Sequence, residues 1–265
     1  MYSSLQLAKK YLQYYFTASN GRGHGMHSPF VFDFILHVLN NKKQYEAPDE
    51  IEALRKQLGT DKTVVTIEDL GAGSRVRSSK QRSVSNLTKN AIKPKKYSQL
   101  LYRLVKHYQP KIIIELGTSL GITTAYLSKA NPFATTITIE GGKEVATIAQ
   151  QNFKALDCPN IHSIVGNFDD VLPAIIGQQP TIDLVYIDGN HRLQPTLNYF
   201  QQFLAKIDNN SVLVFDDIHW SKEMEDAWET IKRHPSVTCT VDVFFLGFVF
   251  FKQEFKEKQH FVVRF

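Results

Sequence analysis

Residues 112–121 read Ile-Ile-Ile-Glu-Leu-Gly-Thr-Ser-Leu-Gly, and the chain continues as Ile-Thr-Thr-Ala-Tyr-Leu. The apolar run that opens this stretch is typical of a buried parallel strand. The strand ends in the carboxylate of Glu115, and the chain then turns through two glycines into a helix. Gly117 can supply a left-handed turn, and Gly121 allows the helix to pack closely. The stretch therefore predicts a strand, a ligand-binding loop and a helix, as in an α/β sheet.

The charge of this loop restricts its ligand. A dinucleotide pyrophosphate prefers bare backbone amides at a helix N-terminus, and Glu115 would repel it, which argues against a nicotinamide oxidoreductase. A ligand with a positively charged amino acid end would tolerate Glu115. An acid followed by spaced glycines between the first strand and the first helix resembles the first motif of the class I methyltransferases, which bind S-adenosylmethionine. An ordinary strand-to-helix turn is the alternative for this motif taken alone.

Two further segments repeat the order of strand and polar residue. Residues 134–140 form a β-branched strand ending in Glu140, where a Rossmann-like sheet places its ribose-binding acid, and we expect Glu140 to accept both ribose hydroxyls. Residues 161–165 form a third strand. By resemblance, Asn167 and Phe168 line the adenine face and Asp169 binds its exocyclic amine, although helix capping alone would explain an Asn and an Asp there. The resemblance implies a cofactor site made of Glu115, Gly117, Thr118, Ser119, Gly121, Glu140, Gly141, Asn167, Phe168, Asp169 and Asp188.

Length and composition limit the class of protein. At 265 residues with 43% hydrophobic content, the chain can bury a substantial core, as one enlarged domain or as a domain with an N-terminal cap. No segment is long and apolar enough to cross a bilayer, and residues 1–10 lack the features of a secretory signal, so we expect a cytoplasmic protein. Cys158 and Cys239 show no metal-ligand spacing and are interpreted as packing residues.

Basic residues concentrate in one segment. Of the 31 Lys and Arg, eleven lie in residues 71–114, which hold no Asp or Glu, leaving 20 basic against 26 acidic residues elsewhere. Beside an active site, such a segment could hold a phosphate, a carboxylate or a nucleic acid; a solvated surface is the alternative. Few aromatic residues interleave with the charges of residues 75–96, which disfavours binding of single strands by base stacking.

We divide the chain into an N-terminal helical cap with a basic loop (residues 1–94) and a methyltransferase-like domain (residues 95–265). Apolar positions at helical spacing in residues 1–16 predict an amphipathic helix, which could pack as a lid or lie on a membrane. Two more helices are expected, at residues 30–39 and 49–58.

A glycine-rich turn between the first two helices contains His24 and His27. No Cys or carboxylate lies close in sequence to complete a metal site. We therefore favour loop structure or substrate contact for these histidines over metal binding.

Residues 63–74 also look like a strand that enters a glycine loop. The residues after Gly73 lack the apolar helix period that a βαβ unit needs to cover its sheet. We therefore interpret residues 69–85 as a basic loop, a candidate substrate lid.

Two strands in the second half end in carboxylates. Residues 181–188 end in Asp188, and residues 211–217 end in Asp216 and Asp217. In a doubly wound sheet ordered 3-2-1-4-5 these strands are neighbours, so the three carboxylates should converge and would suit Mg²⁺, Ca²⁺ or Mn²⁺. The arrangement resembles the metal-dependent catechol and caffeoyl-coenzyme A O-methyltransferases. That family has an Asp after the fourth strand and an Asp-Asn pair after the fifth, and its metal chelates the acceptor oxygens.

Two residues depart from that pattern. Asp217 stands where the family has Asn, and His191 stands where it has a lysine. Because an imidazole titrates near neutrality, His191 with Asp188 is the candidate catalytic pair that removes a hydroxyl proton from the acceptor. A loop histidine hydrogen-bonded to Asp188 or Asp217 is the alternative, and methyltransferases that bind no metal also have acids at these strand ends.

The end of the chain completes the expected sheet. Residues 237–251 contain two β runs with a link too short for a parallel crossover, so they should pair antiparallel. Class I methyltransferases end in such a hairpin. The expected fold is a Rossmann-like, doubly wound α/β sheet of seven strands, in the order 3-2-1-4-5-7-6 with the last strand antiparallel. Residues 259–265 add either an edge strand or a contact in a homodimer.

The resemblance covers residues 97–252 and implies an S-adenosylmethionine-dependent methyltransferase that acts on an oxygen of a small acceptor. It leaves open whether the acceptor is acidic and whether Mg²⁺ or another divalent cation assists. A metal-independent N- or O-methyltransferase of the same fold is the first alternative. A basic nucleic-acid-binding protein with a vestigial fold is the second, and it predicts no cofactor affinity and strongly salt-dependent binding.

Overall fold

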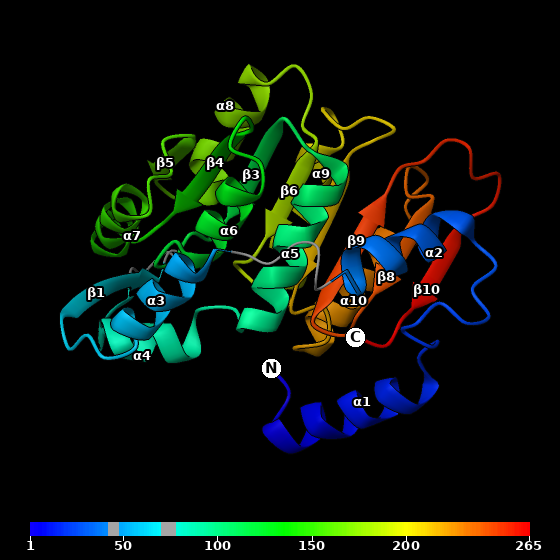
Figure 1. Cartoon of the computed structure of the whole chain (residues 1–265), viewed down its shortest axis with the longest axis horizontal. Coiled ribbons are helices and arrows are strands. Elements are labelled where there is room, and N and C mark those ends of the chain that lie inside the picture. Colours follow the sequence, from blue (N-terminus) through cyan, green and yellow to red (C-terminus); the bar gives the residue numbers. More distant parts are fainter. Residues whose placement is uncertain (42–47, 70–77) are drawn as a thin grey trace. The chain divides into compact units, whose positions relative to one another are not determined.

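The structure is a computed structural model that describes residues 1–41, 48–69 and 78–265. Eight strands belong to a Rossmann-like sheet that is mostly parallel, and helices alternate with the strands along the chain (Figure 1). A separate hairpin contains two more strands. The expected fold class is confirmed, with eight strands in the sheet where the sequence predicted seven.

The chain divides into two compact units. We call residues 41–175 the central unit, and residues 1–40 together with 176–265 the terminal unit. The segment predicted as one cap, residues 1–94, contributes to both units, and its boundary stays a prediction. Within the described ranges, no helix has both the length and the apolar character that a membrane crossing requires.

The central unit contains the three strands predicted first. They are parallel, with β4 in the middle, and residues 113–116 of β3 are buried, as the apolar run predicted. The bounds are β3 Ile112–Leu116, β4 Thr135–Glu140 and β5 Ile161–Val165, with α5 Lys95–Tyr108 before β3, α6 Ile122–Ala130 and α7 Lys143–Ala155 between the strands, and α8 Phe168–Gln178 after them.

The segment predicted as a basic loop is in part a hairpin, which corrects that prediction. β1 (Val64–Asp69) pairs antiparallel with β2 (Ser78–Ser83), and α4 (Val84–Asn90) follows directly. Backbone pairing needs no apolar side chains, so the polar sequence of β2 satisfies the edge of β1 without the periodicity that reveals a strand. Residues 70–77 lie outside the described residues. The inference that this segment is not a second βαβ unit is confirmed, and α3 (Asp49–Leu58) forms where predicted.

The terminal unit contains the remaining five strands of the sheet. β6 and β7 are parallel, β9 pairs antiparallel with β7 on one side and β8 on the other, and β10 pairs parallel with β8 at the edge. The predicted C-terminal hairpin and its insertion beside the fifth predicted strand are confirmed, and β10 is the additional strand. The bounds are β6 Leu184–Ile187, α9 Leu193–Phe203, β7 Val212–Asp216, α10 Lys222–Arg233, β8 Cys239–Asp242, β9 Leu246–Phe250 and β10 Gln259–Val262.

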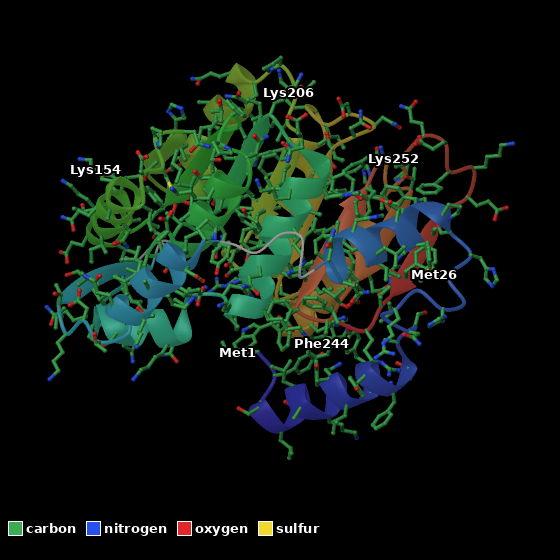
Figure 2. The ribbon with its side chains drawn as sticks, in the orientation of Figure 1. Met1, Met26, Lys154, Lys206, Phe244 and Lys252 are labelled. Atoms are coloured by element: carbon green, nitrogen blue, oxygen red, sulfur yellow. The ribbon has the colours of Figure 1, made fainter. Side chains whose placement is uncertain are left out.

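The N-terminal helices complete the terminal unit. α1 (Ser4–Thr17) begins with a reciprocal capping box between Ser3 and Gln6, and α2 (Pro29–Phe34) continues as a π-helical turn (Ile35–Leu39). α1 packs through Tyr14 and neighbouring aromatic side chains on Phe244, which Figure 2 labels. The predicted amphipathic helix therefore covers part of its own unit.

Candidate functional site

In the glycine loop, residues 117–121, three backbone φ angles are positive. Gly117, Ser119 and Gly121 have φ angles of 103°, 47° and 81°. The N–H groups of Gly117 and Thr118 both donate to the carbonyl of Ile139, at 3.0 and 3.2 Å. Because Gly121 is the N-cap of α6 and has no side chain, no side chain caps the first-turn amides of α6. These amides can donate to an anionic group such as the carboxylate of an amino acid.

Two side chains of helix α7 contact this loop. A Cβ on Gly121 would lie 2.7 Å from Cζ of Phe153 and closer still to Cε1, so only glycine fits at this position. The side-chain amide of Asn152 donates to the carbonyl of Leu120 at 2.9 Å. Asn152 and Phe153 were not predicted, since nothing in the helical pattern of α7 marks them as partners of a loop some 30 residues earlier.

Glu140 is held at the end of β4 by two backbone amides. Its Oε2 accepts from the N–H of Ser119 at 2.8 Å, and its Oε1 accepts from the N–H of Gly142 at 2.9 Å. Burial raises the pKa of Glu140 above its ordinary value, against the lowering effect of the N–H groups of Gly142, Ser119 and Gly141. Each carboxylate oxygen keeps a further lone pair, so Glu140 can accept two hydroxyl hydrogens while the loop holds it in place.

Glu115 is fully buried. Its Oε2 accepts from the hydroxyls of Thr124 on α6 and Thr138 on β4, the latter at 2.7 Å, and Thr118 contacts the Thr138 hydroxyl at 2.6 Å. The carboxylate thus joins β3, β4 and α6 beneath the loop. Because Glu115 is enclosed by these hydroxyls, its predicted cofactor role stays a prediction.

The residues predicted for the adenine pocket surround the start of α8. The Asn167 side chain accepts from the N–H of Asp169 at 3.2 Å, and its carbonyl accepts from the N–H of Asp170 at 3.1 Å. Asn167 and Phe168 are half-buried, whereas Asp169 is exposed. Asn167 therefore acts as a helix cap here, and the adenine contacts stay a prediction.

In the terminal unit, a buried tyrosine joins two of the predicted acids. The hydroxyl of Tyr186 lies 3.0 Å from Oδ2 of Asp188 and 3.2 Å from Oδ2 of Asp216. Tyr186 and Asp216 are buried, and Asp188 is partly exposed. Nε2 of His191 lies 3.6 Å from Oδ1 of Asp188, which suits an ion pair but exceeds a hydrogen bond.

Asp217 follows in a left-handed conformation, with φ of 52°. Its N–H donates to Oδ1 of Asp216 at 2.9 Å and to the carbonyl of Phe245 at 2.7 Å. Among the described residues, the predicted trio of Asp188, Asp216 and Asp217 does not bring one carboxylate oxygen from each within 4.8 Å of the others. The structure thus joins Asp188 and Asp216, while metal binding by the three stays a prediction.

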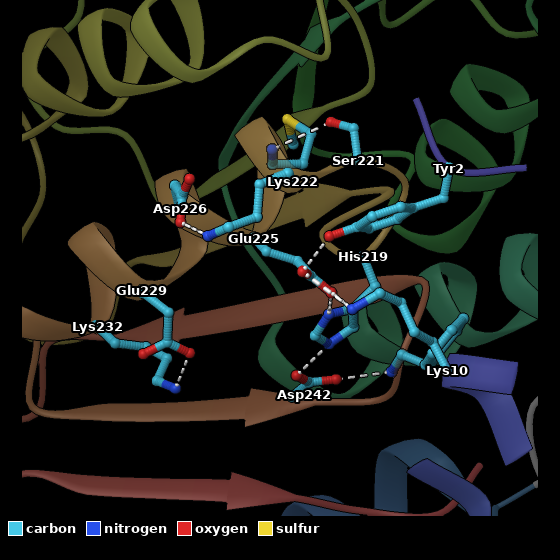
Figure 3. A network of polar contacts seen from close by, with 12 residues as sticks. Tyr2, Lys10, His219, Ser221, Lys222, Glu225, Asp226, Glu229, Lys232 and Asp242 are labelled. Atoms are coloured by element: carbon cyan, nitrogen blue, oxygen red, sulfur yellow. Dashed lines mark hydrogen bonds and ion pairs between the residues drawn. The ribbon is translucent and has the colours of Figure 1, made fainter. Parts of the chain in front are cut away.

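The turn after β7, residues 216–220, which we call the acidic turn, continues into a polar network (Figure 3). Nε2 of His219 lies 2.7 Å from Oδ2 of Asp242, and its Nδ1 lies 3.3 Å from Oε1 of Glu225. Burial lowers the pKa of His219, but the carboxylates of Asp242 and Glu225 outweigh this and raise it above its ordinary value. The network was not predicted, since no periodicity or motif marks His219, Glu225 and Asp242 as partners.

The structure also describes the two histidines of the glycine-rich turn and part of the basic segment. His24 and His27 lie in an exposed turn, as predicted, and His27 lines a cavity of about 250 Å³ with Ser28 and Gln259. In the basic segment, Arg103 is buried, which lowers its pKa to about 10, whereas Lys95 is exposed. The basic segment is therefore not a uniform solvated surface.

Two sequence comparisons relate the chain to known methyltransferases. Residues 114–218 match a family model described as a methyltransferase domain. The chain is 32% identical over 127 residues to a catechol O-methyltransferase from Niastella koreensis, a match that covers 46% of this chain and 55% of that enzyme. The chain thus spans little more than half the length of this relative.

Solved structures share the fold. An O-methyltransferase from Bacillus cereus in complex with S-adenosylhomocysteine aligns with a TM-score of 0.59 at 17% identity, covering 79% of this chain and 94% of that one. A methyltransferase from Podospora anserina bound to S-adenosylhomocysteine aligns with a TM-score of 0.61 at 13% identity, covering 85% and 97%. The expected resemblance to O-methyltransferases of the catechol and caffeoyl-coenzyme A type is confirmed, and the solved structures show the shared fold.

Proposed function

We propose that this chain is an S-adenosylmethionine-dependent methyltransferase that transfers a methyl group to an oxygen of a small acceptor. The observation that carries the proposal is the position of Glu140, which the amides of Ser119 and Gly142 hold at the end of β4 beside a left-handed glycine loop. The methyltransferase domain match and the fold of the solved relatives support it.

We assign cofactor binding to residues of the central unit. Glu140 would accept the ribose hydroxyls, and the amides at the start of α6 would bind the carboxylate of the methionine end. An ionised Glu115 would favour a cationic ligand over an anionic one. When bound, the cofactor supplies an electrophilic methyl group on a sulfonium.

On the acceptor side, we assign the proton transfer to the terminal unit. His191 would take the hydroxyl proton at Nε2, and Asp188 at 3.6 Å would stabilise the resulting imidazolium. Tyr186 keeps Asp188 and Asp216 in place through its hydroxyl.

A divalent cation at Asp188, Asp216 and Asp217 is a finer hypothesis. Carboxylate oxygens are the donors that Mg²⁺ and Mn²⁺ prefer, and a bound metal would lower the pKa of an acceptor hydroxyl. Melting curves of the wild type and of Asp216→Asn with and without Mn²⁺ test it, because an ion bound to the folded state raises the melting temperature. Curves indifferent to Mn²⁺ would select the metal-independent enzyme.

The experiment for the cofactor is calorimetric titration with S-adenosylhomocysteine. Glu140→Ala should weaken binding by about 2 kcal/mol, or roughly 30-fold, as expected for the loss of charge-assisted hydrogen bonds. Asp170→Ala is the matched control, since Asp170 is an exposed acid near the predicted pocket with no assigned contact to the ligand. Equal affinity of Glu140→Ala and the wild type would remove Glu140 from the site.

The same titration separates the remaining alternative. A nucleic-acid-binding protein with a vestigial fold would give no heat with S-adenosylhomocysteine, and its affinity for a single-stranded oligonucleotide would fall steeply with salt. The methyltransferase predicts saturable binding of S-adenosylhomocysteine in the wild type.

A further inference from the structure

The N-terminal segment contacts the acidic turn and the start of α10. The N–H of Tyr2 donates to the carbonyl of Trp220 at 3.0 Å, and its hydroxyl donates to Oε2 of Glu225 at 2.7 Å. Lys10 of α1 donates to both oxygens of Glu225, at 2.9 and 3.2 Å. Figure 3 shows Tyr2, Lys10 and His219 gathered around Glu225.

The same helix packs on the turn between β8 and β9. The ring of Tyr11 contacts the ring of Phe244 edge-on, with 5.0 Å between the ring centroids, and stacks on the ring of Phe245 at 6.1 Å. The ring centroids of Tyr14 and Phe244 are 5.2 Å apart. Phe244 is buried and has φ of 72°, a conformation that bulky side chains seldom adopt. The surroundings of this turn, α1 among them, must therefore hold it in a strained conformation.

The strained β8–β9 turn also holds Asp217, through a backbone hydrogen bond. The carbonyl of Phe245 accepts the N–H of Asp217 at 2.7 Å, and Asp217 is itself left-handed. His219 makes a second connection, since it contacts Asp242 at the base of the hairpin and Glu225 at the other side. The position of Asp217 thus depends on two sets of contacts, and α1 takes part in both.

We propose that α1 positions the acidic turn, with Lys10 and Tyr2 as positioning residues that act through Glu225. Loss of their contacts releases α1, relaxes the turn at Phe244 and frees Asp217 from its left-handed conformation. The proposal rests on the proposed function, because it concerns catalysis only if Asp216 and Asp217 serve the acceptor. The outer face of α1 exposes Leu5 and Phe16, so α1 is held through its inner face and can be released by changes on that face.

Hydrogen exchange of the full chain, followed by mass spectrometry, tests this coupling. Lys10→Ala should raise the exchange rate of peptides spanning residues 213–221 and 242–248 by roughly fivefold, as expected for the loss of a partly buried ion pair. Lys9→Ala is the matched control, because Lys9 lies next to Lys10 on the exposed face of the helix. Lys10→Arg should restore the protection, since a guanidinium can also pair with Glu225.

Faster exchange in α1 alone, with residues 213–221 unchanged, would show that α1 docks without positioning the turn and would overturn the proposal. Unchanged exchange in both regions would overturn it too. Tyr2→Phe, which removes one hydrogen bond at constant shape, should change the same peptides in the same direction by a smaller factor. Titration of these variants with S-adenosylhomocysteine should give the wild-type affinity; if no form binds it, the proposed function fails while the exchange result still decides the coupling.

Discussion

The glycine loop of the central unit and the acidic turn of the terminal unit both follow a strand of the sheet, yet their supports differ. The glycine loop is held by residues between Glu115 and Phe153, which belong to consecutive elements of the chain. The acidic turn is held from α1, β6, α10 and the β8–β9 hairpin, so its contacts reach from Tyr2 to Phe245. The glycine loop is thus held by local contacts, whereas the acidic turn depends on the packing of its whole unit.

If this contrast is correct, one change inside the glycine loop should have the largest effect. Gly121→Ala places a Cβ against the ring of Phe153 at a residue with φ of 81°. We expect the free energy of unfolding in urea to fall by about 3 kcal/mol, from overpacking and left-handed strain together, with loss of S-adenosylhomocysteine binding.

Gly177→Ala is the control for that change, because nothing lies within 4 Å of a Cβ at Gly177. We expect it to alter the free energy of unfolding by less than ~1 kcal/mol, in the stabilising direction. Adding Phe153→Leu to Gly121→Ala should recover part of the loss by making room. Equal stability of the two alanine variants would mean that the loop is not packed as described.

The same contrast explains what the sequence could predict. The strands β3, β4, β6 and β7 were predicted because each is an apolar or β-branched run followed by an acid at or near its end, and the C-terminal hairpin was predicted because its link is short. Strand β2 was missed, since its sequence is polar and its pairing uses the backbone alone. Hydrophobic periodicity shows which face of a helix or strand is buried. It does not reveal a strand that is held only by backbone hydrogen bonds to its neighbour.

The candidate site was predictable to the same degree. Glu140 was predicted as a ribose-binding acid from its place at the end of the second strand, and this role stays a prediction. Its amide partners Ser119 and Gly142 were seen only in the structure. Tyr186 was missed, since an aromatic residue within a buried strand is indistinguishable from core until its hydroxyl is seen between two carboxylates. The network around His219 needs contacts more than 200 residues apart, which no local pattern contains.

Tyr186→Phe tests the terminal half of the comparison with an intermediate effect. Removing the hydroxyl takes away a donor shared by Asp188 and the buried Asp216, so we expect the free energy of unfolding to fall by about 2 kcal/mol. Tyr15→Phe makes the same chemical change on an exposed ring and should stay within ~0.5 kcal/mol of the wild type. A fall no larger than that of Tyr15→Phe would mean that the two acids do not depend on this tyrosine.

The smallest expected effect is the pH dependence of ligand binding through Glu140. Burial raises the pKa of Glu140, so in the free protein this carboxyl takes up a proton at a higher pH than an ordinary glutamate. For stability, the contribution of Glu140 is present below its unfolded pKa and is lost as pH rises through its raised folded pKa. For the proposed binding the sign is opposite, because ribose hydroxyls would donate to the charged form and lower the pKa of Glu140 in the complex. The dissociation constant for S-adenosylhomocysteine should therefore increase severalfold as pH falls from neutrality through the raised pKa.

Calorimetric titrations at several pH values check this, with Glu140→Gln as the form that cannot titrate at this position. An equal pH dependence of the dissociation constant in the wild type and in Glu140→Gln would assign the effect to another group.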